Sequence, residues 1–123
     1  MKHSLEVYFK SDLIFHSDNH WLHPLFELES FLISASISAQ HLFLKDKIIG
    51  KAAALLIVNL KISSVYTKTL SNLGKAVLEE HNINFEYMSL LDRIDCKTEI
   101  LMADINDPAE AYRFIQARIK KNN

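Results

Sequence analysis

The chain has few residues that form crosslinks or interrupt helices and strands: one cysteine, two glycines and two prolines among 123 residues. A single cysteine excludes an intrachain disulfide, so nothing favours an oxidising compartment. There is no excess of charge either, since 14 basic residues stand against 15 acidic ones. This balance weighs against the basic surface that extended nucleic-acid binding needs.

Long apolar runs are also missing. The most apolar block, residues 48–60, is interrupted by Lys51 and Asn59 and falls short of the roughly 20 residues that span a membrane. The N-terminal segment lacks the apolar stretch of a secretory signal. We therefore expect a cytoplasmic protein with no membrane association.

What is present is an ordinary globular composition, 49% hydrophobic and 24% charged, which predicts one domain over residues 1–123. Apolar and polar residues alternate over residues 5–9, and residues 13–15 form a second short strand candidate, so a hairpin is expected around residues 10–12. Helix and strand patterns then alternate along the chain. This order predicts an α/β fold with a mixed or mostly parallel sheet.

The boundaries of these elements follow from apolar spacing and capping residues. We predict helices from His23-Pro24, from Lys47 with Asp46 as N-cap, after Ser71, and after Asp107-Pro108-Ala109-Glu110, and strands at residues 41–44, 64–67 and 84–87. The helix at residues 47–60 is apolar around almost its whole circumference, which predicts burial on most sides.

The block Asp46-Lys47-Ile48-Ile49-Gly50-Lys51-Ala52-Ala53-Ala54 resembles the signature of a small prokaryotic family of unknown function with a cytidine-deaminase-like fold. The likeness extends to His23–Leu28, Val65-Tyr66, Ser71 and Asp107–Ala111, and so covers nearly the whole chain. The resemblance implies a mixed central sheet of about five strands flanked by helices.

One segment departs from that family. Its members show a Cys-Pro-Met-Glu run after the last strand, whereas this chain has Ile94-Asp95-Cys96-Lys97-Thr98-Glu99-Ile100-Leu101-Met102. The Thr and Met correspond, but the Cys-Pro pair is absent. Whatever site the run forms in relatives is therefore expected to be lost or altered here.

Zinc-dependent deamination is the chemistry that the sequence excludes most firmly. A zinc deaminase needs His-x-Glu at one helix start and Pro-Cys-x-x-Cys at another, to hold the metal and move a proton. One cysteine cannot form the second motif, and the resemblance places Gly50-Lys51-Ala52-Ala53 where the first would stand. We expect no metal and no cofactor.

The start of the buried helix is the candidate ligand site, with Asp46, Lys47, Gly50, Lys51 and Ser71 as its residues. Free N–H groups and the helix dipole favour an anion, Gly50 allows close approach, and the two lysines add positive charge. The alternative is that Gly50 only permits close packing while the lysines face solvent. Ser71 is equally explained as a helix cap.

Two other groups of residues have alternative interpretations. His16, His20 and His23, with Asp18 between them, could bind a divalent metal, or could form a polar loop that leads into a helix. Cys96 could act as a nucleophile, but a lone cysteine is more often a small buried apolar residue.

The sequence thus favours a deaminase-like domain without a zinc site that binds a small anionic or nucleotide-like ligand. The alternative is a non-catalytic interaction module that associates with itself or with another protein.

Overall fold

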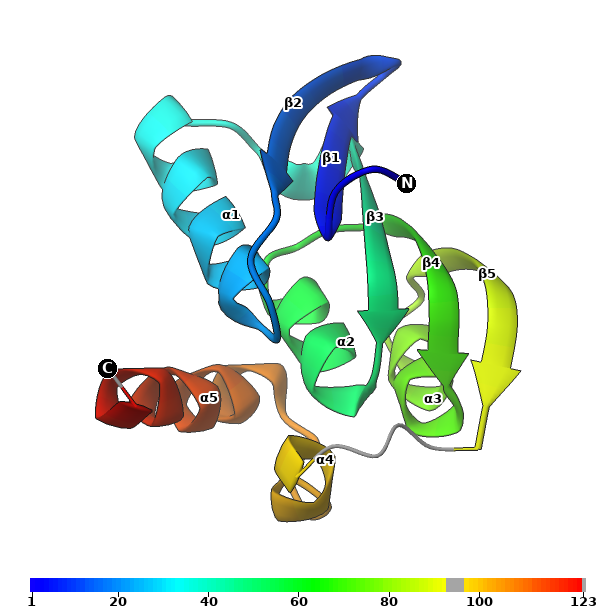
Figure 1. Ribbon diagram of the computed structural model, residues 1–123, viewed down its shortest axis with the longest axis vertical. Helices are drawn as coiled ribbons and strands as arrows, with labels where there is room; N and C mark the ends of the chain where they lie inside the picture. Colours follow the sequence, from blue (N-terminus) through cyan, green and yellow to red (C-terminus); the bar gives the residue numbers. More distant parts are fainter. Residues whose placement is uncertain (93–96, 123) are drawn as a thin grey trace.

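The computed structural model describes residues 1–92 and 97–122, and its strands form one mixed, open sheet (Figure 1). The strands are β1 (Leu5–Phe9), β2 (Asp12–Ser17), β3 (Leu42–Ile49), β4 (Ser64–Ser71) and β5 (Asn84–Leu91). Their order is β2-β1-β3-β4-β5; β1 is antiparallel to both neighbours, and β3, β4 and β5 are parallel. The predicted mixed sheet of about five strands is confirmed.

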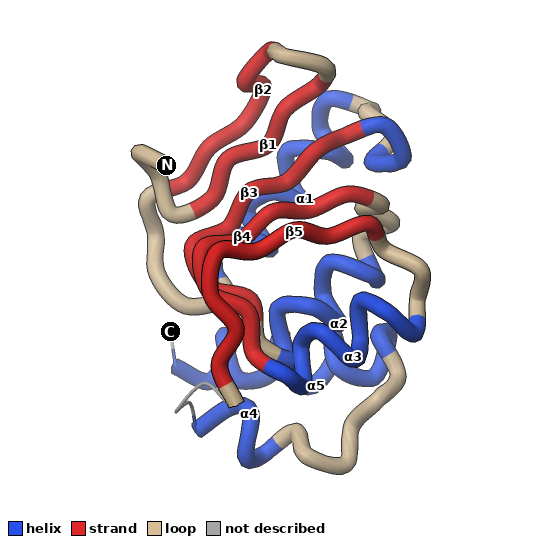
Figure 2. The backbone as a smooth tube through the Cα atoms, turned by 90° about the vertical axis from the view of Figure 1, so that its right-hand side faces the viewer, coloured by secondary structure: helices blue, strands red, loops and turns tan. Residues whose placement is uncertain are grey.

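The helices of the described residues form a layer around one central helix. They are α1 (His23–Ala35), α2 (Lys51–Asn59), α3 (Asn72–Glu80), α4 (Lys97–Leu101) and α5 (Pro108–Asn122), with a short 3-10 turn at Ala39–His41. α2 contacts α1, α3, α4 and α5, and Figure 2 shows α2, α3 and α5 on one side of the strands. Every residue from Lys51 to Ile57 is buried, so the prediction of a helix enclosed on most sides is confirmed.

α2 begins later than the sequence predicts. The expected helix start at Lys47, with Asp46 as N-cap, is wrong, because β3 continues to Ile49 and Gly50 is the residue before the helix. Asp46 pairs with Leu5 of β1 and with Thr67 of β4, and the β4 ladder continues through Ile48 and Ile49. These two ladders, together with the β-branched Ile48 and Ile49, outweigh the local capping signal.

Two other predicted helix starts are confirmed by hydrogen bonds. The Ser71 hydroxyl oxygen accepts from the backbone N–H of Gly74 at 2.9 Å, and an Asp107 carboxylate oxygen accepts from the backbone N–H of Glu110 at 2.9 Å. Each cap satisfies an N–H group that the first helical turn leaves without a partner. The caps therefore fix where α3 and α5 begin.

The parallel strands are longer than their hydrophobic pattern predicts. β3, β4 and β5 each have eight residues, whereas the pattern marks only residues 41–44, 64–67 and 84–87. Their second halves carry polar residues or lie at an exposed edge, so apolar alternation fades there while the backbone ladder continues. The short helix α4 has no counterpart among the sequence predictions.

Candidate functional site

β3 and β4 end side by side, and a helix begins directly after each of them. Ile49 pairs with Leu70 in the parallel ladder, so Gly50 and Ser71 lie at the same edge of the sheet. In open parallel sheets, ligands bind at this carboxyl edge, next to the helix N-termini. We call this part of the sheet edge, at Gly50 and Ser71, the corner, and a ligand site is expected there.

The corner is held from one side by a close approach of α3. A Cβ atom added at Gly74 would lie 3.0 Å from the carbonyl oxygens of both Ile49 and Gly50. Both neighbours are backbone atoms and have little freedom to move away. Glycine at position 74 is therefore what allows α3 to pack against the turn from β3 into α2.

Lys51 and Glu99 connect the start of α2 to α4. The backbone N–H of Lys51 donates to Oε1 of Glu99, and its ammonium donates to the carbonyl oxygens of Met102 at 3.0 Å and Ala103 at 2.9 Å. Lys51 is only 5% exposed. The carboxylate of Glu99 thus lies at the positive end of the α2 dipole, and the ammonium serves the carbonyl groups that follow α4.

The second carboxylate oxygen of Glu99 has no hydrogen-bond partner. Glu99 is 7% exposed, and its Oε2 is buried without a donor among the described residues. A buried acceptor without a donor costs about 1–3 kcal/mol. A water molecule or a bound molecule can supply the donor that such a group needs.

A cavity of about 190 Å³ lies against this corner. Its lining is mainly apolar, with few polar groups, as is usual for small-molecule sites. The lining residues are Trp21, Leu22, Ile48, Gly50, Ala52, Ala53, Thr98 and Glu99.

Trp21 at the edge of this cavity has an unusual backbone conformation. Its φ angle is 58°, in the left-handed region, and its side chain is 40% exposed. That region is rare for large residues, and such strained residues cluster at functional sites. The conformation places a broad aromatic surface beside an apolar cavity.

Three of the predicted site residues lie at this corner, but with different roles. Gly50 lines the cavity. Lys51 directs its ammonium toward the end of α4. Ser71 is fully buried, and its hydroxyl oxygen caps α3.

The other two predicted residues do not line the cavity. Asp46 is partly buried in β3, where burial raises the pKa of its carboxyl to about 7, although the backbone N–H groups of Ile48 and Lys47 act in the opposite direction. Lys47 has an exposed side chain, and its backbone N–H donates to the carbonyl oxygen of Ser4 at 3.3 Å.

Sequence reasoning missed three cavity residues: Trp21, Thr98 and Glu99. Glu99 lies in the segment that departs from the family's Cys-Pro-Met-Glu run, so the resemblance did not single it out. Cys96 lies outside the described residues, so its two interpretations stay open. No sequence pattern marked Trp21 as a cavity residue, since its position there depends on its left-handed backbone conformation.

The histidine group also differs from the one considered in the sequence. His16 and Asp18 come together with His3, which belongs to the segment before β1. His20 and His23 are not part of the group.

The fold and the corner define a class of protein: an α/β domain with an open, mixed five-stranded sheet and a small cavity at the carboxyl edge of its parallel strands. Within that class, the chain belongs to the family described as domain of unknown function DUF1893 (TM1506), whose model matches residues 2–119. No protein with a curated description matches the chain.

A solved structure supports the fold. It is the crystal structure of a DUF1893 family protein (TM1506) from Thermotoga maritima, with a TM-score of 0.83 and 24% sequence identity. The match covers 94% of this chain and 80% of that one, and at this identity it shows the fold alone. Among the described residues, no helix is long and apolar enough to cross a membrane.

Proposed function

We propose that the chain is a deaminase-like domain without a zinc site that binds a small nucleotide-like ligand in the cavity at the start of α2. The observation that carries the proposal is Oε2 of Glu99, a buried acceptor without a partner among the described residues, in a side chain that lines the cavity. The mixed sheet, with β1 antiparallel to its neighbours, is in line with the cytidine-deaminase-like fold that the sequence resemblance implies.

Glu99 determines which part of a ligand the cavity recognises. Because the ammonium of Lys51 is bound to carbonyl oxygens, an anion in the cavity would meet a carboxylate and no free cation from that side chain. A ligand N–H or amino group would instead donate to Oε2 and remove the cost of its burial. The proposal therefore assigns the donor edge of a base, and not a phosphate, to the cavity.

The volume of the cavity agrees with a single ring system. Cavities that enclose drug-sized molecules have about 300–1,000 Å³, whereas this one has about 190 Å³. The apolar walls suit a flat ring, and Trp21 offers an aromatic face for stacking. A sugar or phosphate attached to the ring would extend toward solvent.

The proposed activity is binding without zinc-dependent deamination. Gly50-Lys51-Ala52-Ala53 stands where the resemblance places His-x-Glu, and one cysteine cannot form Cys-x-x-Cys. Without those ligands the chain cannot activate water as zinc deaminases do.

A thermal-shift experiment tests the proposal, with amino-bearing bases and nucleosides compared with phosphate and small carboxylates. A ligand that binds only the folded state, present at ~100 times its dissociation constant, adds about 2.7 kcal/mol of stability. We expect amino-bearing rings to raise the melting midpoint of the wild type. Glu99→Gln should abolish the shift, and Glu80→Gln, which alters an exposed carboxylate on α3, should leave it unchanged.

Trp21→Ala provides a second variant in case Glu99→Gln impairs folding, since it removes one cavity wall from an exposed position. It should reduce the shift caused by the same ligands. The proposal is wrong if no compound in the panel raises the midpoint, or if only phosphate and carboxylates do so.

A second candidate function is self-association, and the observation that favours it is the exposed apolar edge strand β5.

A further inference from the structure

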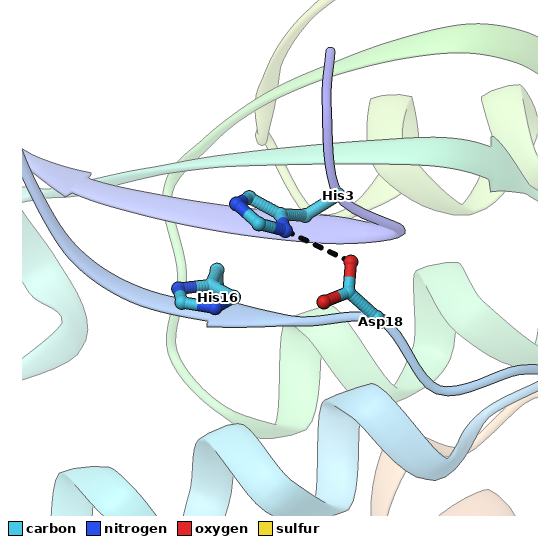
Figure 3. A group of neighbouring side chains, drawn as sticks. All are labelled: His3, His16 and Asp18. Atoms are coloured by element: carbon cyan, nitrogen blue, oxygen red, sulfur yellow. Dashed lines mark hydrogen bonds and ion pairs between the residues drawn. The ribbon is translucent and has the colours of Figure 1, made fainter.

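Three side chains with metal-binding atoms meet away from the cavity, where the N-terminal segment lies against the end of β2 (Figure 3). His3 precedes β1, His16 lies in β2 and Asp18 directly follows it. The antiparallel ladder pairs Glu6 with His16, so the segment before β1 passes beside the residues after β2. One ligand atom from each of the three residues lies within 4.8 Å of the others.

We propose that His3, His16 and Asp18 bind a divalent transition-metal ion. Two imidazoles and a carboxylate suit zinc, nickel, copper or cobalt, whereas magnesium and calcium prefer oxygen ligands alone. Three protein ligands would leave at least one coordination position open to solvent. This site is independent of the cavity at α2.

The three ligand atoms can bind one ion once the ring of His16 turns and moves closer to the other two residues. Metal bonds of about 2.0–2.2 Å in tetrahedral geometry place neighbouring ligand atoms roughly 3.3 Å apart. Nδ1 of His3 and Oδ1 of Asp18 are 2.8 Å apart in a hydrogen bond that the ion would replace. His16 then has to bring one ring nitrogen closer to this pair.

The imidazole of His16 has the freedom to do so. The two histidine rings are stacked, with centroids 3.9 Å apart and planes inclined by 24°. A metal ion lies in the plane of each imidazole that binds it, so one ring must turn. His16 is exposed and forms no side-chain hydrogen bond among the described residues, whereas His3 is held by Asp18.

Asp18 is ready to act as a ligand. Its hydrogen bond with His3 is the main cause that lowers the pKa of the Asp18 carboxyl, and the nearby charges of His16 and Lys47 act in the same direction. An ordinary aspartate carboxylate is ionised at neutral pH, as a metal ligand must be. Lys47 is a neighbouring cation, so its charge opposes the binding of the ion.

Titration of tag-free protein with Co²⁺, followed by visible absorption and by competition with Zn²⁺, tests the proposal. We expect one equivalent to bind with absorption bands of low-coordinate cobalt. His16→Gln should weaken binding by about tenfold or more, since the change removes a ligand. His20→Gln is the matched control, because His20 is exposed and nearby in sequence but outside the cluster, and it should bind as the wild type does.

The melting midpoint of each variant without metal verifies folding, and Asp18→Asn gives a second test at an exposed position. The proposal is overturned if the wild type binds no Co²⁺ or Zn²⁺ up to millimolar concentrations. It is also overturned if His16→Gln and Asp18→Asn bind as tightly as the wild type.

Discussion

Asp46 is a partly buried acidic residue in the central strand β3, and its environment makes stability depend on pH. Asp46 pairs with Leu5 of β1 and Thr67 of β4, and burial raises the pKa of its carboxyl from 3.8 to about 7. Between these two values, the folded chain holds a proton that the unfolded chain has lost. The free energy of unfolding should therefore decrease as pH rises from about 4 to 7.

Replacement of Asp46 by Asn removes this titration. Because Asn keeps an oxygen that accepts backbone hydrogen bonds, we expect Asp46→Asn to be more stable than the wild type at pH 8 and less dependent on pH between 4 and 7. Urea denaturation at several pH values measures both effects. Asp12→Asn, at an exposed position, is the control, and parallel pH profiles for the wild type and Asp46→Asn would contradict the prediction.

At the scale of elements, the turn from β3 into α2 depends on how closely α3 approaches it. Gly74 is a helical residue, and alanine is normally about 1 kcal/mol better than glycine in a helix. At this position a Cβ atom would instead lie 3.0 Å from two backbone carbonyl oxygens. The tertiary contact thus opposes the intrinsic preference of the helix.

We expect Gly74→Ala to destabilise the protein by about 1–3 kcal/mol, because α3 must move away from the corner. Chemical denaturation measures the loss, and Lys75→Ala on the same helix is the control. A Gly74→Ala variant as stable as the wild type would contradict the prediction, because α3 could then move away from the corner without a loss of stability.

The short helix α4 depends on hydrogen bonds with the start of α2 for its stability. Its five residues are far fewer than an isolated helix needs in water. Glu99 accepts from the start of α2, and the Lys51 ammonium binds the carbonyl oxygens at the end of α4. No local pattern in residues 97–101 contains this information, so the sequence did not predict the helix.

At the scale of the whole molecule, the sheet is open and β5 forms one of its edges. Tyr87, Met88, Leu90 and Leu91 of β5 are 39%, 71%, 40% and 44% exposed. An exposed edge strand with apolar side chains is a template for pairing with another chain. A second copy of this chain, which brings an identical edge, is the partner that we propose for the alternative function.

If the edge associates, the mass in solution should rise with protein concentration. Met88→Lys should lower the association, because a lysine on an edge strand disfavours pairing. Ile33→Lys, which places the same charge on the exposed face of α1, is the control and should leave the association unchanged. Light scattering over a concentration series gives the answer, and a monomer at every concentration would count against self-association.

The sequence by itself determined the class of fold and most element positions, because apolar spacing and the caps at Ser71 and Asp107 act locally. It also predicted that the chain is not a zinc-dependent deaminase, since one cysteine cannot form Cys-x-x-Cys in any fold. It also predicted a ligand site at Gly50 and Lys51, which stays a prediction, and it began the helix too early.

Only the tertiary structure decided which side chains face that corner. Glu99 arrives there from a helix 48 residues further along the chain, and its carboxylate replaces the anion that the free helix start would attract. His3 joins His16 and Asp18 because β1 and β2 pair in one particular register. Both arrangements are contacts between segments that are distant in the sequence. The spacing of residues along the chain does not determine which distant residues come into contact in the folded protein.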